Sequence, residues 1–378
     1  MTDMTETEAD IGSAGYSVEP PDPGGHMFLF RETEHPEGGR PRSIAFKDVT
    51  VVPRGYEELV ATRPGKPVTI DLDMRGGRIV DTDIEDLDRN RLVNLKATLE
   101  SHFTANSIGL VAGGWLPSIL AATSADAVIL LDRNVVTEIV SRFDQGEARG
   151  RPADFLDMLS GMDVSINPCL YAMEGSEQRS PDSDHIREEL EQVTRRLTQA
   201  LPKAKLMVGP LSVRGIAGLV SESREDSDRS IAFLLEVAPL LGAPVGRRRQ
   251  ECIWKEVVSI GRRFGLAPQA FVLLAALSAV VTPQSAPARS LLKFRPGYGA
   301  ELAYNAVCDL RAIEYFLNCM ARLPDAPVQL CTADRALALF WTALGASSHL
   351  ERGRLAVSMR PHPALLPGDY VARWNGLA

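Results

Sequence analysis

The chain has 378 residues, of which 45% are hydrophobic and 24% charged, as in ordinary soluble globular proteins with one large or two modest domains. A formal net charge of −8 gives no overall attraction to nucleic acid, so such binding must come from local basic patches. Five scattered cysteines without CxxC pairing argue against a disulfide framework, and six histidines without metal-ligand spacing argue against a zinc site. Reduced thiols favour a cytoplasmic location. The sequence also lacks the run of about 18 apolar residues that a membrane span needs, so no membrane association is expected.

The first third of the chain predicts a tail followed by a small mixed unit. Residues 1–26 are acidic and rich in Gly and Pro, so we expect a disordered tail. Residues 27–124 predict an N-terminal α+β extension, with strands at 43–52 and 67–72.

Two further elements are expected within this extension. A helix is predicted over 87–103 because its apolar residues follow a helical stripe: Leu92, Leu95, Leu99 and Phe103. Residues 108–122 are apolar but interrupted by two glycines, and Pro117 is suited to the start of a helix.

An apolar run at residues 127–131 ends in the carboxylate of Asp132, and a helical pattern follows to about residue 143. The run is short and partly β-branched, which predicts a strand buried on both faces. Ligands of open α/β sheets bind beyond the carboxyl ends of the strands, so Asp132 lies where a site is expected. The alternative is that Asp132 only caps the following helix.

A second apolar run, at residues 328–331, ends in Thr332 and Asp334 and precedes another apolar helix. If the two strands are parallel neighbours, Asp132 and Asp334 lie at one edge of one sheet. Like charges brought close repel each other unless a cation neutralises them. Carboxylate ligands favour Mg²⁺ or Mn²⁺ over zinc. Capping of the next helix is again the alternative for Asp334.

The remaining chain after residue 143 predicts mostly helices. We expect helices at 151–159, 168–174 and 300–323 and weak strands at 164–166 and 355–359. Residues 175–184 predict an exposed loop, and residues 185–282 are helical almost throughout. The nearly all-apolar segment 269–281 predicts a buried helix, and 283–289 a linker.

Four segments together resemble the PIN-domain family of metal-dependent nucleases. Residues 130–136 (LLDRNVV) look like the family's opening strand and Asp-x-Asn turn, and residues 171–174 (YAME) look like its helical Glu. Residues 305–313 (NAVCDLRAI) resemble its Asp-led helix, and residues 330–337 (LCTADRAL) its Thr-x-Asp turn.

The resemblance implies an α/β fold, with a PIN-like parallel sheet flanked by helices over residues 125–378. It departs from a compact family member through the N-terminal extension and through a helical insertion at about 178–297. It also implies Mg²⁺- or Mn²⁺-dependent phosphodiester hydrolysis, with RNA preferred to DNA as the substrate. Either added region would be the place for a protein partner or a second copy of the chain.

The resemblance assigns roles to particular residues. The expected metal ligands are Asp132, Glu174, Asp309 and Asp334. Thr332 would position Asp334 or a water, while Asn134 and Asn305 would support the ligands. Apart from the resemblance, the basic run Arg247, Arg248 and Arg249 is the best candidate for phosphate contacts, with a solvated surface as the alternative. Arg133 and Arg335 lie beside the acidic residues, and their expected role is either to hold the nucleic-acid backbone or to screen the carboxylates in the metal-free protein.

Two other functions compete with a nuclease. Asp71 and Asp73, in the sequence VTIDLD, resemble the opening of haloacid-dehalogenase-type phosphatases, although the alternating pattern also fits a half-exposed strand of a hairpin. A non-catalytic PIN-like scaffold is the third class, and metal binding would distinguish it from the two enzymes.

Overall fold

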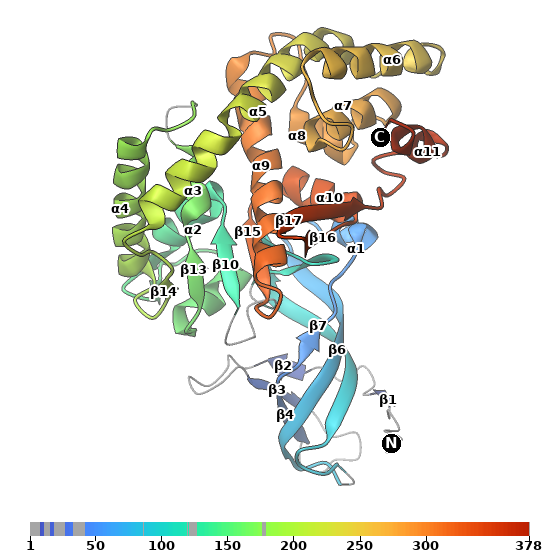
Figure 1. Ribbon diagram of the computed structural model, residues 1–378. Coiled ribbons are helices and arrows are strands. Elements are labelled where there is room, and N and C mark those ends of the chain that lie inside the picture. The colour runs from blue at the N-terminus through green and yellow to red at the C-terminus, as the bar shows by residue number, and fades with distance from the viewer. Residues whose placement is uncertain are drawn as a thin grey trace.

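The computed structural model describes residues 8–10, 16–18, 27–32, 42–85, 87–118, 120, 127–175 and 179–377. Figure 1 shows three parts: an N-terminal sheet at the bottom, a central sheet with its helices in the middle, and a group of helices at the top. The protein is mixed α/β, as expected: strands dominate up to β10 (Val128–Leu131), and helices dominate after it. Within the described residues, no helix has both the length and the apolar character needed to cross a membrane.

The N-terminal sheet is a seven-stranded, mostly antiparallel structure. Its order is β1-β7-β6-β4-β3-β2, with the short β5 paired to β6. The strands are β1 (Glu8–Asp10), β2 (Tyr16–Val18), β3 (Met27–Glu32), β4 (Ser43–Lys47), β5 (Thr50–Val51), β6 (Pro67–Thr82) and β7 (Leu92–Thr104). Of the predicted disordered tail, residues 8–10 and 16–18 thus form strands, and the rest lies outside the described residues.

The helix predicted over 87–103 is wrong, because this segment contains the strand β7. It pairs antiparallel with β6, and Val93 and Leu95 turn into the core while Leu92 is exposed. Leu95, Leu99 and Phe103 are spaced by four, so they lie on one face of a strand as readily as on one stripe of a helix. Pairing with the long strand β6 makes this segment a strand and not a helix.

The central sheet has the order β14-β13-β10-β15-β8-β9. The first four strands are parallel, and β8 and β9 extend the sheet as antiparallel neighbours of β15. The strands are β8 (Ile108–Val111), β9 (Gly114–Pro117), β10 (Val128–Leu131), β13 (Ser165–Asn167), β14 (Lys205–Leu206) and β15 (Val328–Thr332). The chain moves outward from β10 to β13 and β14, then crosses to the other side of β10 to form β15.

The helix start predicted at Pro117 is also wrong, because Pro117 is the last residue of β9. Gly113, with φ of 80°, turns the chain between β8 and β9. A Cβ at Gly114 would lie 2.1 Å from the carbonyl oxygen of Arg54, so only glycine fits there. Residues 119 and 121–126 lie outside the described residues.

Helices flank the central sheet and build the top of the molecule. Near the sheet are α1 (Tyr56–Ala61), α2 (Arg133–Arg142), the 3₁₀ helix η2 (Phe155–Gly161), α3 (Cys169–Glu174), α4 (Ser183–Ala200), α9 (Ala300–Arg322) and α10 (Arg335–Leu344). The top contains α5 (Ser212–Leu241), α6 (Arg247–Arg263), α7 (Phe271–Val281) and α8 (Pro287–Leu292). Short pairs β11 (Phe143–Asp144) with β12 (Glu147–Ala148) and β16 (Ala346–Glu351) with β17 (Arg354–Met359), and α11 (Tyr370–Asn375), complete the described chain.

The region expected to be an insertion at 178–297 divides into two parts. Helix α4 and strand β14 belong to the central sheet, because β14 pairs with β13. The helical insertion is therefore α5 to α8. Every residue of α7 is buried, as its apolar sequence predicts, and the linker expected at 283–289 is helical from Pro287 onward.

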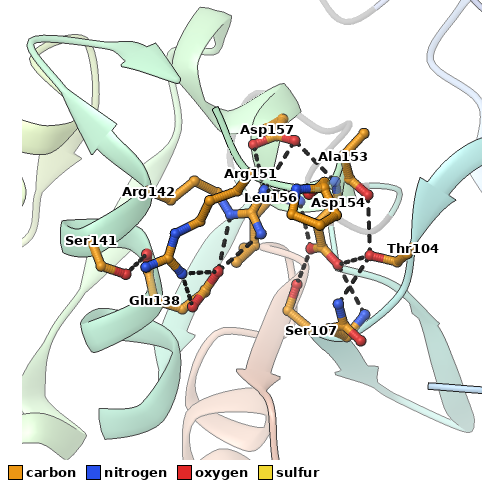
Figure 2. A network of polar contacts seen from close by, with 12 residues as sticks. Thr104, Ser107, Glu138, Ser141, Arg142, Arg151, Ala153, Asp154, Leu156 and Asp157 are labelled. Carbon is orange, nitrogen blue, oxygen red and sulfur yellow. Dashed lines mark hydrogen bonds and ion pairs between the residues drawn. The ribbon is translucent and has the colours of Figure 1, made fainter. Parts of the chain in front are cut away.

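A buried polar network joins the N-terminal sheet to the central unit (Figure 2). Asp154 is 1% exposed and accepts hydrogen bonds from the hydroxyls of Thr104 and Ser107 and from the backbone N–H groups of Asn106 and Leu156. Beside it, the buried Arg142 pairs with Glu138 and Asp157. Burial opposes the charge of Arg142, but these two carboxylates raise its pKa.

Replacing Asp154 should therefore destabilise the whole chain. In Asp154→Ala, four donors, three of them in buried hydrogen bonds, lose their acceptor, and we expect the free energy of unfolding to fall by about 3 kcal/mol. Urea denaturation measures the change, with the exposed Asp163→Ala as the matched control. Equal midpoints for the two variants would contradict a structural role for this network.

Candidate active site at the strand ends

Two carboxylates lie side by side because β10 and β15 are adjacent parallel strands. Leu130 pairs with Leu330 and Leu131 with Cys331, and the N–H of Asp132 donates to the carbonyl of Cys331 at 3.0 Å. The chain changes direction between these strands, and the crevice at such a switch point is where open α/β sheets bind ligands. The sequence-based prediction that Asp132 and Asp334 share one edge is confirmed.

The two carboxylates have different local roles. Asp334 accepts hydrogen bonds from the N–H groups of Ala336 and Leu337 at 2.7 and 3.2 Å, so it is the N-cap of α10. Asp132 is 8% exposed and accepts a 2.7 Å hydrogen bond from the hydroxyl of Thr332. Burial raises the pKa of Asp132, against the effect of this hydrogen bond, and the charge of Asp334 raises it further. Asp334 thus caps its helix through one carboxylate oxygen, whereas the side chain of Asp132 does not cap α2.

Helices α3 and α9 bring two more carboxylates to the same place. Burial raises the pKa of Asp309 well above its usual value, and the charges of Asp334, Asp132 and Glu174 add to this effect. Burial and the charge of Asp132 raise the pKa of Glu174 to about 7. The hydroxyl of Tyr304 on α9 donates to the carbonyl of Glu174 at 2.7 Å and so ties the two helices together. The four carboxyl groups therefore act on one another electrostatically.

A small cavity of about 60 Å³ lies at this convergence. Asp132, Glu174 and Asp309 line it together with residues of α5, including Ser223 and Ser227. The helical insertion thus contributes one wall. We call the four carboxylates (Asp132, Glu174, Asp309 and Asp334) the acidic cluster.

The donor chemistry of the acidic cluster fits a hard divalent cation, since its side chains offer oxygen only and crowd like charges together. Across the described ranges, no three His, Cys, Asp or Glu side chains are grouped closely enough to hold an ion.

The asparagines predicted to support the ligands lie close to them in the chain. Asn134 is exposed in the first turn of α2. Asn305 lies one turn before Asp309 on α9 and is partly buried.

The predicted nucleic-acid contacts are placed differently from one another. The guanidinium of Arg133 stacks on the Tyr171 ring at 4.1 Å and lies 3.5 Å from Glu189. Arg335 donates to the carbonyls of Leu59, Val60 and Thr62 and so binds the end of α1.

The basic run begins α6 in the upper part of Figure 1, away from β10. Arg247 lines a separate cavity of about 680 Å³ with Tyr56 and Tyr370. None of the three arginines lines the cavity at the acidic cluster.

Sequence reasoning missed two basic residues near the acidic cluster. Arg311 lines the cavity and donates to the carbonyl of Ser223 and the hydroxyl of Ser227, which attaches α9 to α5. Its position two residues after Asp309 was the available signal. Lys293 lies 3.6 Å from Asp334, and nothing in its local sequence marks it.

The residues of the phosphatase alternative lie elsewhere. Asp71 and Asp73 are in the middle of β6, an antiparallel strand, where Asp71 accepts a hydrogen bond from Thr98 and Asp73 pairs with Arg75. These two side chains therefore lie on an antiparallel strand, away from the carboxyl ends of parallel strands where open α/β sheets bind ligands.

Comparisons of this chain with known protein families, curated proteins and solved structures find no match.

The raised pKa of Glu174 predicts a particular pH dependence of stability. The folded protein binds a proton more tightly than the unfolded chain, so the free energy of unfolding should fall as pH rises from 4.5 to about 7. In metal-free protein, Glu174→Gln should remove up to about 3 kcal/mol of this fall. Urea denaturation across this range, with the exposed Glu191→Gln on α4 as control, measures it. The same pH dependence in wild type and Glu174→Gln would contradict it.

Thr332 offers a second test of the site's geometry. Its buried hydroxyl donates to Asp132 and accepts from the N–H of Asp334, so Thr332→Val leaves both without a partner. We expect the free energy of unfolding to fall by about 1–3 kcal/mol, whereas Thr332→Ser keeps the hydroxyl and most of the stability. Chemical denaturation compares the pair, and equal losses of stability in both variants would contradict a role for the hydrogen bonds of the hydroxyl.

Proposed function

We propose that the protein is a Mg²⁺- or Mn²⁺-dependent nuclease that hydrolyses phosphodiester bonds, with RNA as its substrate. The observation that carries the proposal is the convergence of four carboxylates, far apart in the chain, at the switch point of a parallel sheet. Burial, together with their mutual repulsion, raises the pKa of Asp309 and Glu174, and a bound cation would neutralise this repulsion.

The residues that would hold the cation are Asp132, Glu174, Asp309 and Asp334. When bound, a divalent cation supplies charge neutralisation at the phosphate and promotes ionisation of a water for attack. The hydrogen bond from Thr332 orients Asp132 and lowers its pKa, against the larger effect of burial. The start of α10 holds Asp334 in one orientation through two N–H groups. The walls from α3, α5 and α9 limit access of bulk water to the carboxylates.

The cation and the substrate in this proposal rest on different arguments. The cation follows from the chemistry of the donor groups, because clustered carboxylates without histidine or cysteine favour hard ions. The choice of nucleic acid, and of RNA within it, follows from the resemblance of four segments to PIN-domain nucleases. Asp71 and Asp73 give the phosphatase alternative no comparable support, because they lie apart from the acidic cluster on an antiparallel strand.

Asp132→Asn and Asp334→Asn should each lower Mn²⁺-dependent cleavage of single-stranded RNA by about 100-fold or more, because each removes a ligand charge. Both variants should melt at least as high as wild type without metal, since they relieve repulsion and Asn also caps helices well. Cleavage assays beside thermal melts test this, with the exposed Asp163→Asn as control.

Two results would contradict the proposal in different ways. Wild-type protein that cleaves no RNA or DNA with either metal is not a nuclease. If the folded Asp132→Asn and Asp334→Asn variants retain full cleavage, the protein is a nuclease but the acidic cluster is not its active site.

A further inference from the structure

The helical insertion ends beside the acidic cluster with a lysine in an unusual backbone conformation. Lys293 is the C-cap of α8 and has a left-handed backbone, with φ of 54°. Helices commonly end in glycine at such a position, because an L side chain is strained there. The strain must be offset by the packing around this residue.

The neighbours of Lys293 provide that packing. Leu292 and Phe294, on either side of it, are 0% and 4% exposed. Helix α8 packs on α10, the helix whose N-cap is Asp334. The backbone of Lys293 is therefore fixed by its buried neighbours, while its own side chain remains 51% exposed.

The side chain of Lys293 lies at the acidic cluster. Its Nζ atom is 3.6 Å from the Oδ2 atom of Asp334, which is the oxygen that does not cap α10. Its charge also lowers the pKa of Asp309, against the stronger effect of burial. Lys293 thus acts on two of the four carboxylates.

The arginines near the acidic cluster are held more firmly than Lys293. Arg133 is stacked on Tyr171, Arg311 donates to two groups of α5, and Arg335 binds the end of α1. By contrast, among the residues that the structure describes, Lys293 has one ion pair, to Asp334 at 3.6 Å, and its side chain is half exposed. Lysine is a compact charge on a flexible stem, so it can move from one oxygen to another at little cost.

We propose that Lys293 binds a phosphate group of the nucleic-acid substrate beside the acidic cluster, and that it pairs with Asp334 when no substrate is bound. The inference rests on the proposed nuclease function and adds a substrate contact supplied by the helical insertion. It also implies that Lys293 competes with a divalent cation for Asp334.

The test compares Lys293→Gln and Lys293→Gly with Lys255→Gln. Lys255 is a matched control because it is also exposed and also pairs with one carboxylate, that of Glu251 on α6. Binding of fluorescent single-stranded RNA is measured without metal at several salt concentrations. Mn²⁺ binding is measured by calorimetry without RNA, and thermal melts report folding.

Both Lys293 variants should bind RNA about 10-fold more weakly, with a salt dependence reduced by about one phosphate contact. Both should bind Mn²⁺ about 3-fold more tightly, because a competing charge is gone. Lys293→Gly should melt higher than Lys293→Gln, since glycine relieves the left-handed strain. Lys255→Gln should match wild type in RNA and Mn²⁺ binding.

The outcomes separate this inference from the nuclease proposal. If wild type binds and cleaves RNA, but the Lys293 variants match Lys255→Gln in salt dependence and Mn²⁺ affinity, the role of Lys293 is overturned and the nuclease stands. Wild type that neither binds nor cleaves RNA overturns both. Weaker RNA binding by the higher-melting Lys293→Gly supports the inference, because a structural role predicts the two properties to change together.

Discussion

The parallel pairing of β10 with β15 brings together two strands that lie far apart in the chain. The hydrogen bond from Thr332 to Asp132 joins residues 200 positions apart in the chain. Everything between them must leave the end of β10 and return to the start of β15. The order β14-β13-β10-β15 satisfies this by building first to one side of β10 and then to the other. The carboxylates meet because this return is fixed.

Bringing the carboxylates together costs stability, and the structure offsets the cost locally. Burial and like charges raise the pKa of Asp132, Asp309 and Glu174. Each buried carboxylate without a partner is unfavourable, so a fold gains little from such a group unless function needs it. Strongly apolar elements compensate elsewhere, above all the fully buried helix α7. Unfavourable features commonly occur at functional sites, where the stability of the surrounding fold offsets their cost.

The sequence was informative where local signals agree and ambiguous where they do not. The buried strands β10 and β15, each followed by a carboxylate and a helix, were predicted because apolar runs and cap residues are local features. The sequence wrongly predicts a helix at strand β7, because a spacing of four residues suits both the helical and the strand period. Strand β14 has only two residues, Lys205 and Leu206, and is defined by its neighbour β13. Lys293 reaches Asp334 only through the packing of α8 on α10. Long-range packing leaves no local pattern to find.

The N-terminal extension and the helical insertion both contact the central unit beside the acidic cluster. From the N-terminal side, the end of α1 accepts hydrogen bonds from Arg335, the residue after Asp334. From the helical insertion, Ser223 and Ser227 on α5 accept hydrogen bonds from Arg311, two residues after Asp309. Each added region is therefore attached through an arginine next to a carboxylate. Through these hydrogen bonds, the N-terminal extension contacts the start of α10 and the helical insertion contacts the middle of α9, the two elements that carry Asp334 and Asp309.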